Sequence, residues 1–398
     1  GYMGEVDISR EVIGVSGPAV DVEAIERELS NQWKAPDLVA LTQMDVVPTR
    51  TSVLNLVLVA PDRVAAARLT RMMGQLSVHH PSRVVIFVIA PAAADPSRAI
   101  EAQVTTQCSA IPDAHIAPCF EQIIVPVPPR ASHIIASVIP ALVLPDLKTF
   151  LWWPGLPPLR DPGMVRVARA VDRLIIDSLD FTHCMVNLTR VHDLCRHLEQ
   201  GCAISDLNWA RMMTWREVMA QFFDAPDHQW ALDAVSRMTL RYGHARGAAD
   251  NAAQALLFAS WIASRLGWQV RGAERWGKDA MIFTARRPDG RDLTIVLERA
   301  PVPRRYNGML LAATLTADDG RRSSEFRAAR VDEDLGTIRV STLVDGVPRL
   351  EYATRCMTSD AGELLVHDLR RPGHDTLYED ALDVARAFVG ALRKREEA

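Results

Sequence analysis

Two uninterrupted apolar stretches, separated by one amphipathic segment, constrain the fold of this chain most. Residues 51–59 and 83–89 are rich in leucine and β-branched side chains, which is typical of strands that are covered on both faces. Between them, a helix is predicted to begin at Pro61, to end near His79 and to bury Val64, Leu69, Met72, Met73 and Leu76. This strand–helix–strand pattern predicts adjacent parallel strands joined by a right-handed crossover.

A short strand that contains two tryptophans is predicted further along the chain. Four consecutive large apolar residues, Phe150 to Trp153, are followed by Pro154 and Gly155. Pro154 offers no amide hydrogen to a sheet, and Gly155 can turn where other residues cannot. Because side chains alternate faces along a strand, at least one of Trp152 and Trp153 points inward. Core packing is the simpler interpretation of both rings, and the alternative is that one of them anchors a partner protein.

The N-terminal half, residues 1–200, is predicted to be an α/β domain with a central mixed sheet. Asp21 is suited to cap a helix, and Pro140 is expected to bend or break another. The remaining elements are expected at 4–20 (an arm or single strand), 21–34 (helix), 101–109 (strand), 122–127 (strand), 130–144 (helix), 162–171 (helix) and 173–178 (strand).

The pattern changes after residue 200, and residues 201–398 are predicted to form an α+β domain. A helix over about 203–224 is apolar around its whole girth, so we expect it to be buried and to link the two halves. A strand at 235–242 and a helix at 252–266, closed by Gly267, come next. The remaining elements are short alternating strands over 269–369, separated by turn signals, which predict an antiparallel meander, and an amphipathic C-terminal helix over 375–395.

Composition excludes several classes of protein. A chain of 398 residues with 48% hydrophobic residues is long enough for two domains with sizeable cores. A formal charge of −4 argues against a dedicated nucleic-acid binder, for which a clustered basic surface is expected. Acidic residues among the first twenty argue against a secretory signal, and the longest apolar run, 134–144, is too short to cross a membrane. We therefore expect a soluble, cytoplasmic protein that binds neither nucleic acid nor membrane.

The six cysteines do not suggest a disulfide scaffold in so long a chain. His and Cys residues gather between 183 and 202, where His192 and Cys195 could share a helix face. Zinc sites usually combine two such close pairs, and no second pair follows at a usual spacing. No metal is therefore expected, and a metal-dependent protein that uses this cluster remains the third and weakest alternative.

The sequence carries none of the common catalytic motifs. The chain contains no G-x-G-x-x-G or G-x-x-x-x-G-K-[ST] phosphate-binding loop, no G-x-S-x-G nucleophile elbow and no H-E-x-x-H pair. Asp177 and Asp180 lie near the carboxyl end of a predicted strand, where α/β sheets place ligands. Carboxylates in such places more often form turns and caps, so we predict no catalytic residue and no cofactor.

Two groups of residues are candidates for binding. His80, Ser82 and Arg83 carry side-chain types that bind anions, although a helix end followed by the Pro81 stop explains the same residues without a ligand. The helical spacing of Trp209, Arg211, Trp215 and Arg216 allows two Trp–Arg pairings, which suit a protein interface. The alternative is that the two arginines line the rim of a buried helix.

A series of short motifs, in order, carries a resemblance over about residues 50 to 270. They are RTSVLNL at 50–56, HPSR at 80–83, CFEQ at 119–122, PDLKTFLWWPG at 145–155, DRLIIDS at 172–178, DLNWAR at 206–211, TWRE at 214–217 and WIASRLGW at 261–268. On these motifs the chain resembles the glucose-6-phosphate dehydrogenase assembly protein family, known as OpcA. Beyond residue 270 the resemblance is of layout alone.

The resemblance implies a non-catalytic partner and allosteric activator of glucose-6-phosphate dehydrogenase, the first enzyme of the oxidative pentose phosphate pathway. The partner-interface candidates are then Trp152, Trp153, Trp209, Arg211, Trp215 and Arg216. Photosynthetic members of the family are linked to redox control through C-terminal cysteines, whereas here Cys356 alone lies beyond residue 202. The second interpretation is an enzyme or sensor that binds a sugar phosphate at the corner formed by His80, Ser82 and Arg83.

Overall fold

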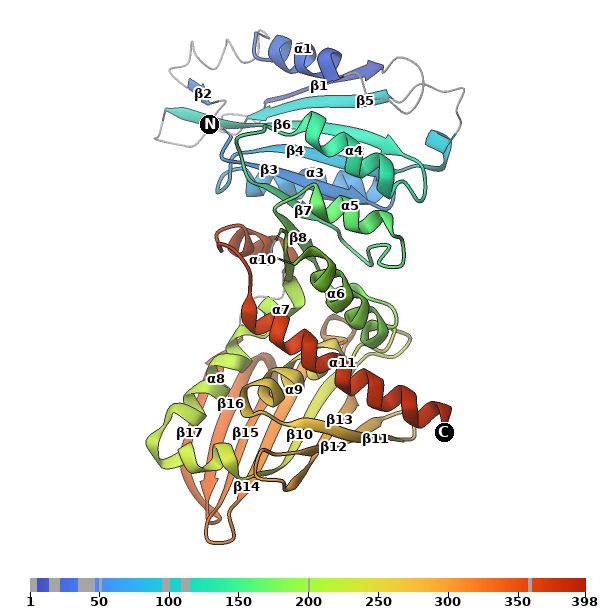
Figure 1. The fold of residues 1–398 in the computed structure, drawn as a ribbon. Helices are drawn as coiled ribbons and strands as arrows, with labels where there is room; N and C mark the ends of the chain where they lie inside the picture. The colour runs from blue at the N-terminus through green and yellow to red at the C-terminus, as the bar shows by residue number, and fades with distance from the viewer. Residues whose placement is uncertain are drawn as a thin grey trace. The chain divides into compact units, whose positions relative to one another are not determined.

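The chain forms two compact units, each assembled from three segments of the sequence (Figure 1). The computed structural model describes residues 6–13, 22–34, 47–49, 52–94, 101–108, 115–199, 201–356 and 360–398. Unit 1 comprises residues 1–176, 197–205 and 361–373, and unit 2 comprises residues 177–196, 206–360 and 374–398. Both units therefore draw on residues from either side of position 200, and the domain boundary predicted there stays a prediction.

Unit 1 is built on a nine-stranded mixed sheet in the order β1-β5-β6-β4-β3-β7-β8-β9, with β2 paired to β6. The strands from β6 to β8 along this order pair in parallel, whereas β1, β5 and β6 pair antiparallel. Its elements are β1 (Val6–Ile13), α1 (Val22–Gln32), β2 (Val47–Thr49), β3 (Leu54–Ala60), α3 (Arg63–Leu76), β4 (Ser82–Ile89), η1 (Pro91–Ala94), β5 (Glu101–Cys108), β6 (Ile116–Val127), α4 (Ser132–Leu142), β7 (Thr149–Trp152), α5 (Gly163–Arg169), β8 (Arg173–Ile176), β9 (Ala203–Asp206) and α10 (Ala361–Asp368). The predicted central mixed sheet is confirmed.

Helices lie on both faces of this sheet. On one face, Gln122 of β6 donates a hydrogen bond to Thr70 of α3 at 3.2 Å. On the other face, Arg83 of β4 donates to Glu26 of α1 and to the Leu142 carbonyl at the end of α4. All seven residues of β3 are buried between these layers, which explains its continuous apolar sequence.

The predicted strand–helix–strand unit is present, with β3 and β4 adjacent and parallel. One detail of the prediction was wrong, because Val64 is 73% exposed. The helix begins after Asp62, whose carboxylate accepts a hydrogen bond from the Ala65 amide at 2.7 Å. With this start, the buried side of α3 consists of Ala65, Ala66, Leu69, Met73 and Leu76.

Unit 2 is built on an eight-stranded sheet in the order β11-β12-β13-β10-β14-β15-β16-β17. Within the described residues, β10 and β13 pair in parallel and the other neighbours pair antiparallel. Its elements are η2 (Ser178–Asp180), most of α6 (Cys184–Leu198), α7 (Leu207–Arg211), α8 (Met213–Asp224), η3 (Pro226–Asp233), β10 (Val235–His244), α9 (Ala253–Leu266), β11 (Gln269–Trp276), β12 (Ala280–Arg286), β13 (Asp292–Pro301), η4 (Arg304–Tyr306), β14 (Leu310–Asp318), β15 (Ser323–Val331), β16 (Asp334–Val344), β17 (Val347–Arg355) and α11 (Thr376–Glu397).

One face of the unit 2 sheet is covered by α8, α9 and α11 (Figure 1). Phe388 of α11 packs edge-on against Phe283 of β12, with ring centroids 4.8 Å apart. The predicted C-terminal helix therefore lies against the meander, and the predicted helix end at Gly267 is also present, with φ of 70°. These features confirm an α+β arrangement for the second half of the chain.

Two predictions about helices were wrong. The expected continuous helix over 203–224 is instead the strand β9 followed by two helices, and the break lies at Met212. Residues 361–368, expected within the strand meander, form the helix α10. A short apolar run fits either a strand or a buried helix, and tertiary contacts decide between them.

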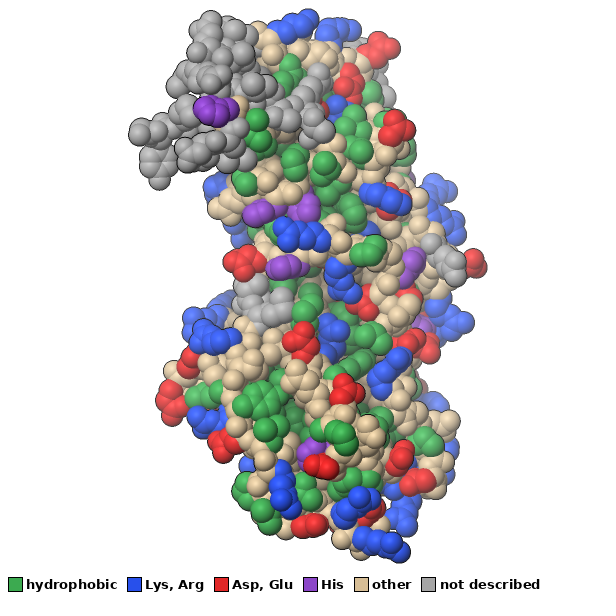
Figure 2. All heavy atoms as spheres, turned by 90° about the vertical axis from the view of Figure 1, so that its left-hand side faces the viewer, with side chains coloured by type: hydrophobic (Ala, Val, Ile, Leu, Met, Phe, Trp, Pro, Cys, Tyr) green, Lys and Arg blue, Asp and Glu red, His purple; other side chains and the backbone are tan. Residues whose placement is uncertain are grey.

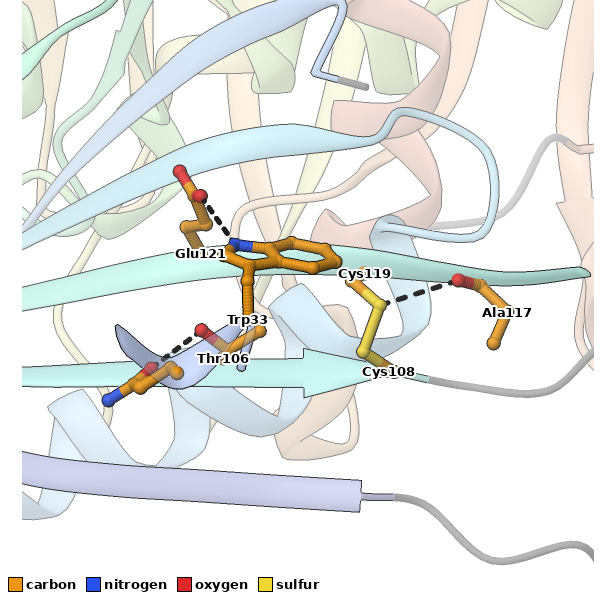
Figure 3. Close-up of a disulfide and its surroundings, with 7 residues drawn as sticks. Trp33, Thr106, Cys108, Ala117, Cys119 and Glu121 are labelled. Carbon is orange, nitrogen blue, oxygen red and sulfur yellow. Dashed lines mark hydrogen bonds between the residues drawn. A yellow bond between two sulfur atoms is a disulfide. The ribbon is translucent and has the colours of Figure 1, made fainter. Parts of the chain in front are cut away.

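A disulfide joins neighbouring strands in unit 1 (Figure 3). Cys108 of β5 and Cys119 of β6 stand directly opposite each other in the strand register, and both are buried. The number of cysteines predicts no disulfide scaffold, and no feature of the sequence singles out this pair. Strand register brings them together across 11 positions of sequence, and register cannot be read from the number of cysteines.

Candidate functional site

A network of buried polar side chains lies within unit 2. Its members share exposed fractions below 9%, and we call them the polar network: Asp177, Ser178, Asp206, Asn208, Arg211, Asn251, Gln254 and Tyr378. Two of its carboxylates cap the elements that follow them. Asp206 accepts a hydrogen bond from the Asn208 amide at the start of α7, and Asp177 accepts one from the Leu179 amide. The chain folds this way because aspartate is well suited to satisfy the unpaired amides at a helix start.

The charge of Asp177 is balanced inside the protein. Arg211 donates to both of its carboxylate oxygens, at 2.6 and 2.7 Å. Asp177 is 3% exposed and Arg211 is 7% exposed, so this is a bidentate ion pair removed from water. Removal of either partner would leave an uncompensated buried charge.

Asp206 has an unusual environment for a carboxylate. Burial, followed by the nearby charge of Asp177, raises its pKa to about 6. Its carboxylate accepts hydrogen bonds from the Ser178 amide at 3.0 Å and from the Tyr378 hydroxyl at 2.9 Å. Burial, followed by the charge of Asp206, in turn raises the pKa of Tyr378 well above its usual value. Burial thus disfavours the charged form of both side chains.

Amide side chains complete the polar network. Asn208 donates to the Ser178 hydroxyl at 3.1 Å and accepts from Gln254 of α9 at 2.8 Å. Asn251 donates to the carbonyls of Ser178 and Leu179, each at 2.9 Å. Together with the bond from Tyr378 of α11 to Asp206, these bonds tie α7, α9, α11 and the turn after β8 to one another. The network can fix the geometry of unit 2. Its charged and polar side chains bond one another, as Arg211 does with Asp177 and Tyr378 with Asp206.

The structure brings Trp209 and Arg216 together, as their spacing suggested. The Arg216 guanidinium lies 4.0 Å from the Trp209 ring centroid, and its Nη2 donates to the Trp209 carbonyl at 3.2 Å. Arg211 does not pair with Trp215, because its guanidinium bonds Asp177. The guanidinium carbon of Arg330 lies 5.6 Å from the Trp215 ring centroid instead. Both tryptophans are 1% exposed.

The two tryptophans of the short strand in unit 1 are also buried. Trp152 in β7 is 4% exposed, and Trp153 directly after it is 6% exposed. Gly155 follows with φ of 77°, which fits its predicted role as a turn residue. Partner binding by the six interface candidates stays a prediction. Because the side chains of Trp152, Trp153, Trp209, Arg211 and Trp215 are buried, any effect on a partner would be exerted through the shape of the chain.

The three anion-binding candidates do not converge on one point. Arg83 is 3% exposed and pairs with Glu121 at 2.9 Å and with Glu26 at 2.5 Å. Ser82 precedes it in β4 and therefore points to the opposite face of the sheet, where its hydroxyl donates to the His80 carbonyl at 2.6 Å. The His80 ring contacts the Val366 carbonyl at 3.2 Å, and burial lowers its pKa. Anion binding at this corner stays a prediction, and it would have to displace the two carboxylates from Arg83.

The cluster of His and Cys residues between 183 and 202 is dispersed in space. Within the described residues, no group of three or more His, Cys, Asp or Glu side chains is arranged to hold a metal ion. The His192 Nε2 lies 2.9 Å from an Asp383 oxygen of α11, and burial raises the pKa of Cys184 to about 12. A thiol with such a pKa is a poor metal ligand at neutral pH.

A tryptophan that the sequence analysis passed over is exposed. Trp276, at the end of β11, has 66% of its surface accessible. It pairs with Ala280, whereas its neighbour Arg275 points to the other face and bonds Glu396 of α11 at 2.7 Å. Trp276 thus lies on the face of the sheet that is turned away from α11. The alternation of side chains along 269–276 was the available signal, but the sequence does not say which face is covered.

The polar surface of the described residues is mixed in sign. Figure 2 shows basic and acidic side chains interspersed over the face that it draws. Ion pairs such as Arg241–Glu298, at 3.0 Å, and Arg327–Glu325, at 2.5 Å, illustrate this alternation on the unit 2 sheet. None of the helices in the described ranges has both the length and the apolar character needed to span a bilayer.

Two protein-family models match the chain in sequence order. The first, described as the N-terminal domain of a glucose-6-phosphate dehydrogenase subunit, matches residues 74–193. The second, described as the C-terminal domain of the same subunit, matches residues 202–382. Together the two matches cover most of the chain, and they include the polar network.

Curated relatives agree with these matches. The OpcA protein of Nostoc punctiforme, named for the OxPP cycle, is 27% identical over 321 residues, which cover 79% of this chain and 66% of the relative. The OpcA protein of Synechococcus elongatus is 31% identical over 279 residues, which cover 66% of this chain and 58% of the relative. The match thus spans about three fifths to two thirds of the length of these relatives.

Solved structures give weaker matches. An oxidoreductase domain protein from Kribbella flavida aligns with a TM-score of 0.44 and 10% identity, over 86% of this chain and 97% of that protein. The UDP-N-acetylglucosamine 3-dehydrogenase GnnA from Acidithiobacillus ferrooxidans aligns with a TM-score of 0.42 and 10% identity, over 86% of this chain and 98% of that protein. On the matches of both domain models and of the curated relatives, the chain belongs to the OpcA family of glucose-6-phosphate dehydrogenase assembly proteins.

Proposed function

We propose that this chain is a non-catalytic assembly factor and allosteric activator of glucose-6-phosphate dehydrogenase in the oxidative pentose phosphate pathway. The observation that carries the proposal is the match, in order, of both domains of the family that is named for this dehydrogenase. The polar network is consistent with it, because its carboxylates are buried and engaged by Arg211, Tyr378 and backbone amides. Groups engaged in this way can maintain a shape, which supports a non-catalytic role.

Activation by a binding partner has a simple physical requirement. A partner shifts the dehydrogenase toward its active form only by as much as it binds that form more tightly than the inactive one. The chain must therefore present a rigid surface that fits one form of the enzyme. In the present proposal the buried tryptophans and the polar network provide rigidity, and another surface provides contact.

We propose that the contact surface includes Trp276 and the adjoining face of the unit 2 sheet. This face, turned away from α9 and α11, carries Thr239 of β10 and Thr314 of β14 in direct register. Short side chains of this kind lose little conformational entropy when a partner covers them. Trp276 adds a large exposed ring, and tryptophan is enriched among the residues that dominate binding energy in protein interfaces.

The proposed partner is tested by dehydrogenase kinetics. Purified glucose-6-phosphate dehydrogenase from the same organism is assayed with and without this chain, and the mixture is analysed by size-exclusion chromatography. We expect co-elution together with a higher kcat or a lower KM for glucose 6-phosphate. Unchanged kinetic constants without co-elution would contradict the proposed function itself.

The proposed surface is tested separately with Trp276→Ala. Loss of a hot-spot ring predicts at least a tenfold weaker apparent affinity for the dehydrogenase, with an unchanged melting temperature because the ring is exposed. Leu350→Ala is the matched control, since Leu350 is also large, apolar and 50% exposed but lies in β17 at the opposite edge of the sheet. If the Trp276→Ala variant activates the dehydrogenase as well as the unmodified chain does, the proposed contact surface is contradicted. The proposal that the dehydrogenase is the partner is not affected by that result.

A further inference from the structure

The strand β17 lies at one edge of the unit 2 sheet (Figure 1). Within the described residues, β17 pairs with β16 and with no second strand. The strand at the other edge, β11, runs beside α11, whose Glu396 accepts a bond from Arg275 at 2.7 Å. Every residue of β17 is exposed or half-buried. An exposed edge strand of this kind is a template for pairing with another strand.

The backbone of β17 offers hydrogen-bonding groups on the side away from β16. Its pairing with β16 is regular from Glu351 to Arg355. The Cys356 amide donates to the Gly336 carbonyl at 2.9 Å, so this amide points towards β16. Amide directions alternate along an antiparallel strand, and the amides of Glu351, Ala353 and Arg355 therefore point outward. These residues can bond a strand that approaches from outside the sheet.

The charged side chains of this stretch lie on the face of the sheet that is turned away from α8. Tyr352 donates to Gln221 of α8 at 3.3 Å, which places the tyrosine on the face that α8 covers. Because side chains alternate faces along a strand, Glu351 and Arg355 lie on the other face. Their side chains are 68% and 74% exposed. Both are thus accessible to a strand that pairs with this edge.

Glu351 and Arg355 carry opposite charges at opposite ends of the regular stretch. An antiparallel strand of the same sequence, centred on Ala353, sets Glu351 of each copy against Arg355 of the other. Within 351–355 this register is the one that places opposite charges directly across from each other, because an axis at Glu351 or at Arg355 pairs like charges. Cross-strand pairs of opposite charge are favourable, and like charges are unfavourable. The sequence of the edge is therefore complementary to itself.

Charges beside the edge extend this complementarity. Within the chain, Arg355 bonds Asp334 at 2.8 Å, and Glu351 lies 3.9 Å from Arg339. Across a paired edge the charges alternate in the order Asp334, Arg355, Glu351 and Arg339, the last two from the second copy. Such pairs are exposed, so they set the register more than the strength of association.

We propose that this chain forms a two-fold symmetric dimer through β17, in which antiparallel β17 strands join the two unit 2 sheets. A two-fold interface uses the same surface of both copies, as a self-complementary strand does. The outward amides and carbonyls of Glu351, Ala353 and Arg355 then bond those of the second copy. The paired edge is short, so we expect a weak dimer with a Kd on the order of 10 µM. Self-association requires no dehydrogenase, and it is therefore tested with this chain alone, independently of the proposed function.

The dimer is tested by sedimentation velocity of the full chain at concentrations from about 1 to 200 µM. We expect the weight-average sedimentation coefficient to rise with concentration. Ala353→Pro should abolish this rise, since proline lacks the outward amide. Its melting temperature should stay close to that of the unmodified chain, because a proline at an outward position of an edge strand leaves the bonds to β16 intact.

A charge exchange tests the register. Glu351→Arg sets arginine against Arg355 of the second copy, and Arg355→Glu sets glutamate against Glu351, so each variant alone should dimerise about tenfold more weakly. An equimolar mixture of the two variants restores opposite charges in both pairs and should dimerise as the unmodified chain does. Glu274→Arg is the matched control, since Glu274 is an exposed glutamate of the other edge strand, β11. Its dimerisation should be unchanged.

The opposite results overturn the proposal. A sedimentation coefficient that is independent of concentration would show that the chain does not self-associate. A dimer that survives Ala353→Pro would use another surface, and a mixture of charge variants that stays monomeric would contradict the register. If Ala353→Pro does not fold, the mixed charge variants decide by themselves. If the chain is monomeric and Ala353→Pro no longer activates the dehydrogenase, the edge takes a strand of that enzyme instead of a second copy.

Discussion

At the scale of single residues, the polar network of unit 2 shows how a family motif can serve structure. The motif at 206–211 supplies Asp206, Asn208 and Arg211, and each of them contacts another network member. Their side chains are polar, yet each is at most 7% exposed. The physical consequence is that single substitutions here should act on stability and on its pH dependence.

Asp206→Asn is expected to change how stability depends on pH. Because the folded pKa of Asp206 is about 6, above the ordinary value of 3.8, the folded state binds more protons between these pH values. The Asp206 contribution to the free energy of unfolding is therefore most favourable below pH 4 and is lost as pH rises through 6. The groups that face it are Asp177, Arg211 and Tyr378. The free energy of unfolding of the variant, relative to that of the unmodified chain, should therefore rise by about 3 kcal/mol between pH 4 and pH 7.

This difference is measured by urea unfolding of both proteins at several pH values. The asparagine can retain an oxygen for the amides of Ser178 and Asn208. A constant difference across this pH range would show that Asp206 keeps an ordinary pKa in the folded protein.

Arg211→Met is expected to destabilise the chain by about 3–5 kcal/mol, since Asp177 would be left charged and buried. Combining it with Asp177→Asn should restore much of this loss, because the uncompensated charge is then gone. Urea unfolding of the two single variants and the double variant measures the coupling. If the double variant is no more stable than Arg211→Met alone, charge pairing is not the cause.

At the scale of secondary-structure elements, neighbouring strands place residues together that the sequence keeps apart. Register sets Cys108 against Cys119 on one face of β5 and β6, and it sets Thr105 beside Gln122 on the opposite face. Alternation along β4 likewise separates Ser82 from Arg83, which explains why the anion-binding candidates do not converge.

Reduction of the Cys108–Cys119 disulfide should lower the stability of unit 1. A bond that closes a loop between residues 11 positions apart contributes about 3 kcal/mol through the entropy of the unfolded chain. Thermal unfolding with and without a reducing agent measures the effect. The double variant Cys108→Ala/Cys119→Ala is the control, and its melting should not respond to the reducing agent. If the unmodified chain has the same melting temperature with and without the reducing agent, the disulfide does not stabilise unit 1.

At the scale of the whole molecule, we expect substitution of a buried tryptophan to lower stability, and substitution of an exposed one to affect partner binding alone. Trp153 is 6% exposed, so Trp153→Ala should cost about 3–5 kcal/mol of stability and reduce dehydrogenase activation in parallel. Trp276 is 66% exposed, so its loss should leave melting unchanged. Thermal unfolding and activation assays on the same preparations make the comparison. A stable Trp153→Ala variant that fails to activate would instead support the original prediction that Trp153 contacts the partner.

Local propensity and hydrophobic periodicity were enough to predict several features of this protein. The crossover of β3, α3 and β4, the turn at Gly155, the helix end at Gly267 and the C-terminal helix follow from propensity, patterning and backbone conformation, all of which act over a few residues. The family also follows from the sequence, because motifs keep their order whether or not their roles are understood.

Which side chains are buried, and which residues contact one another, became evident from the three-dimensional fold. It placed Trp209 and Trp215 inside and Trp276 outside, although all three belong to apolar or alternating stretches. It also gathered the polar network from positions as distant as Asp206 and Tyr378. The physical reason is that burial and hydrogen bonding depend on contacts between distant segments, and these are set by strand register and helix packing, which local sequence does not specify.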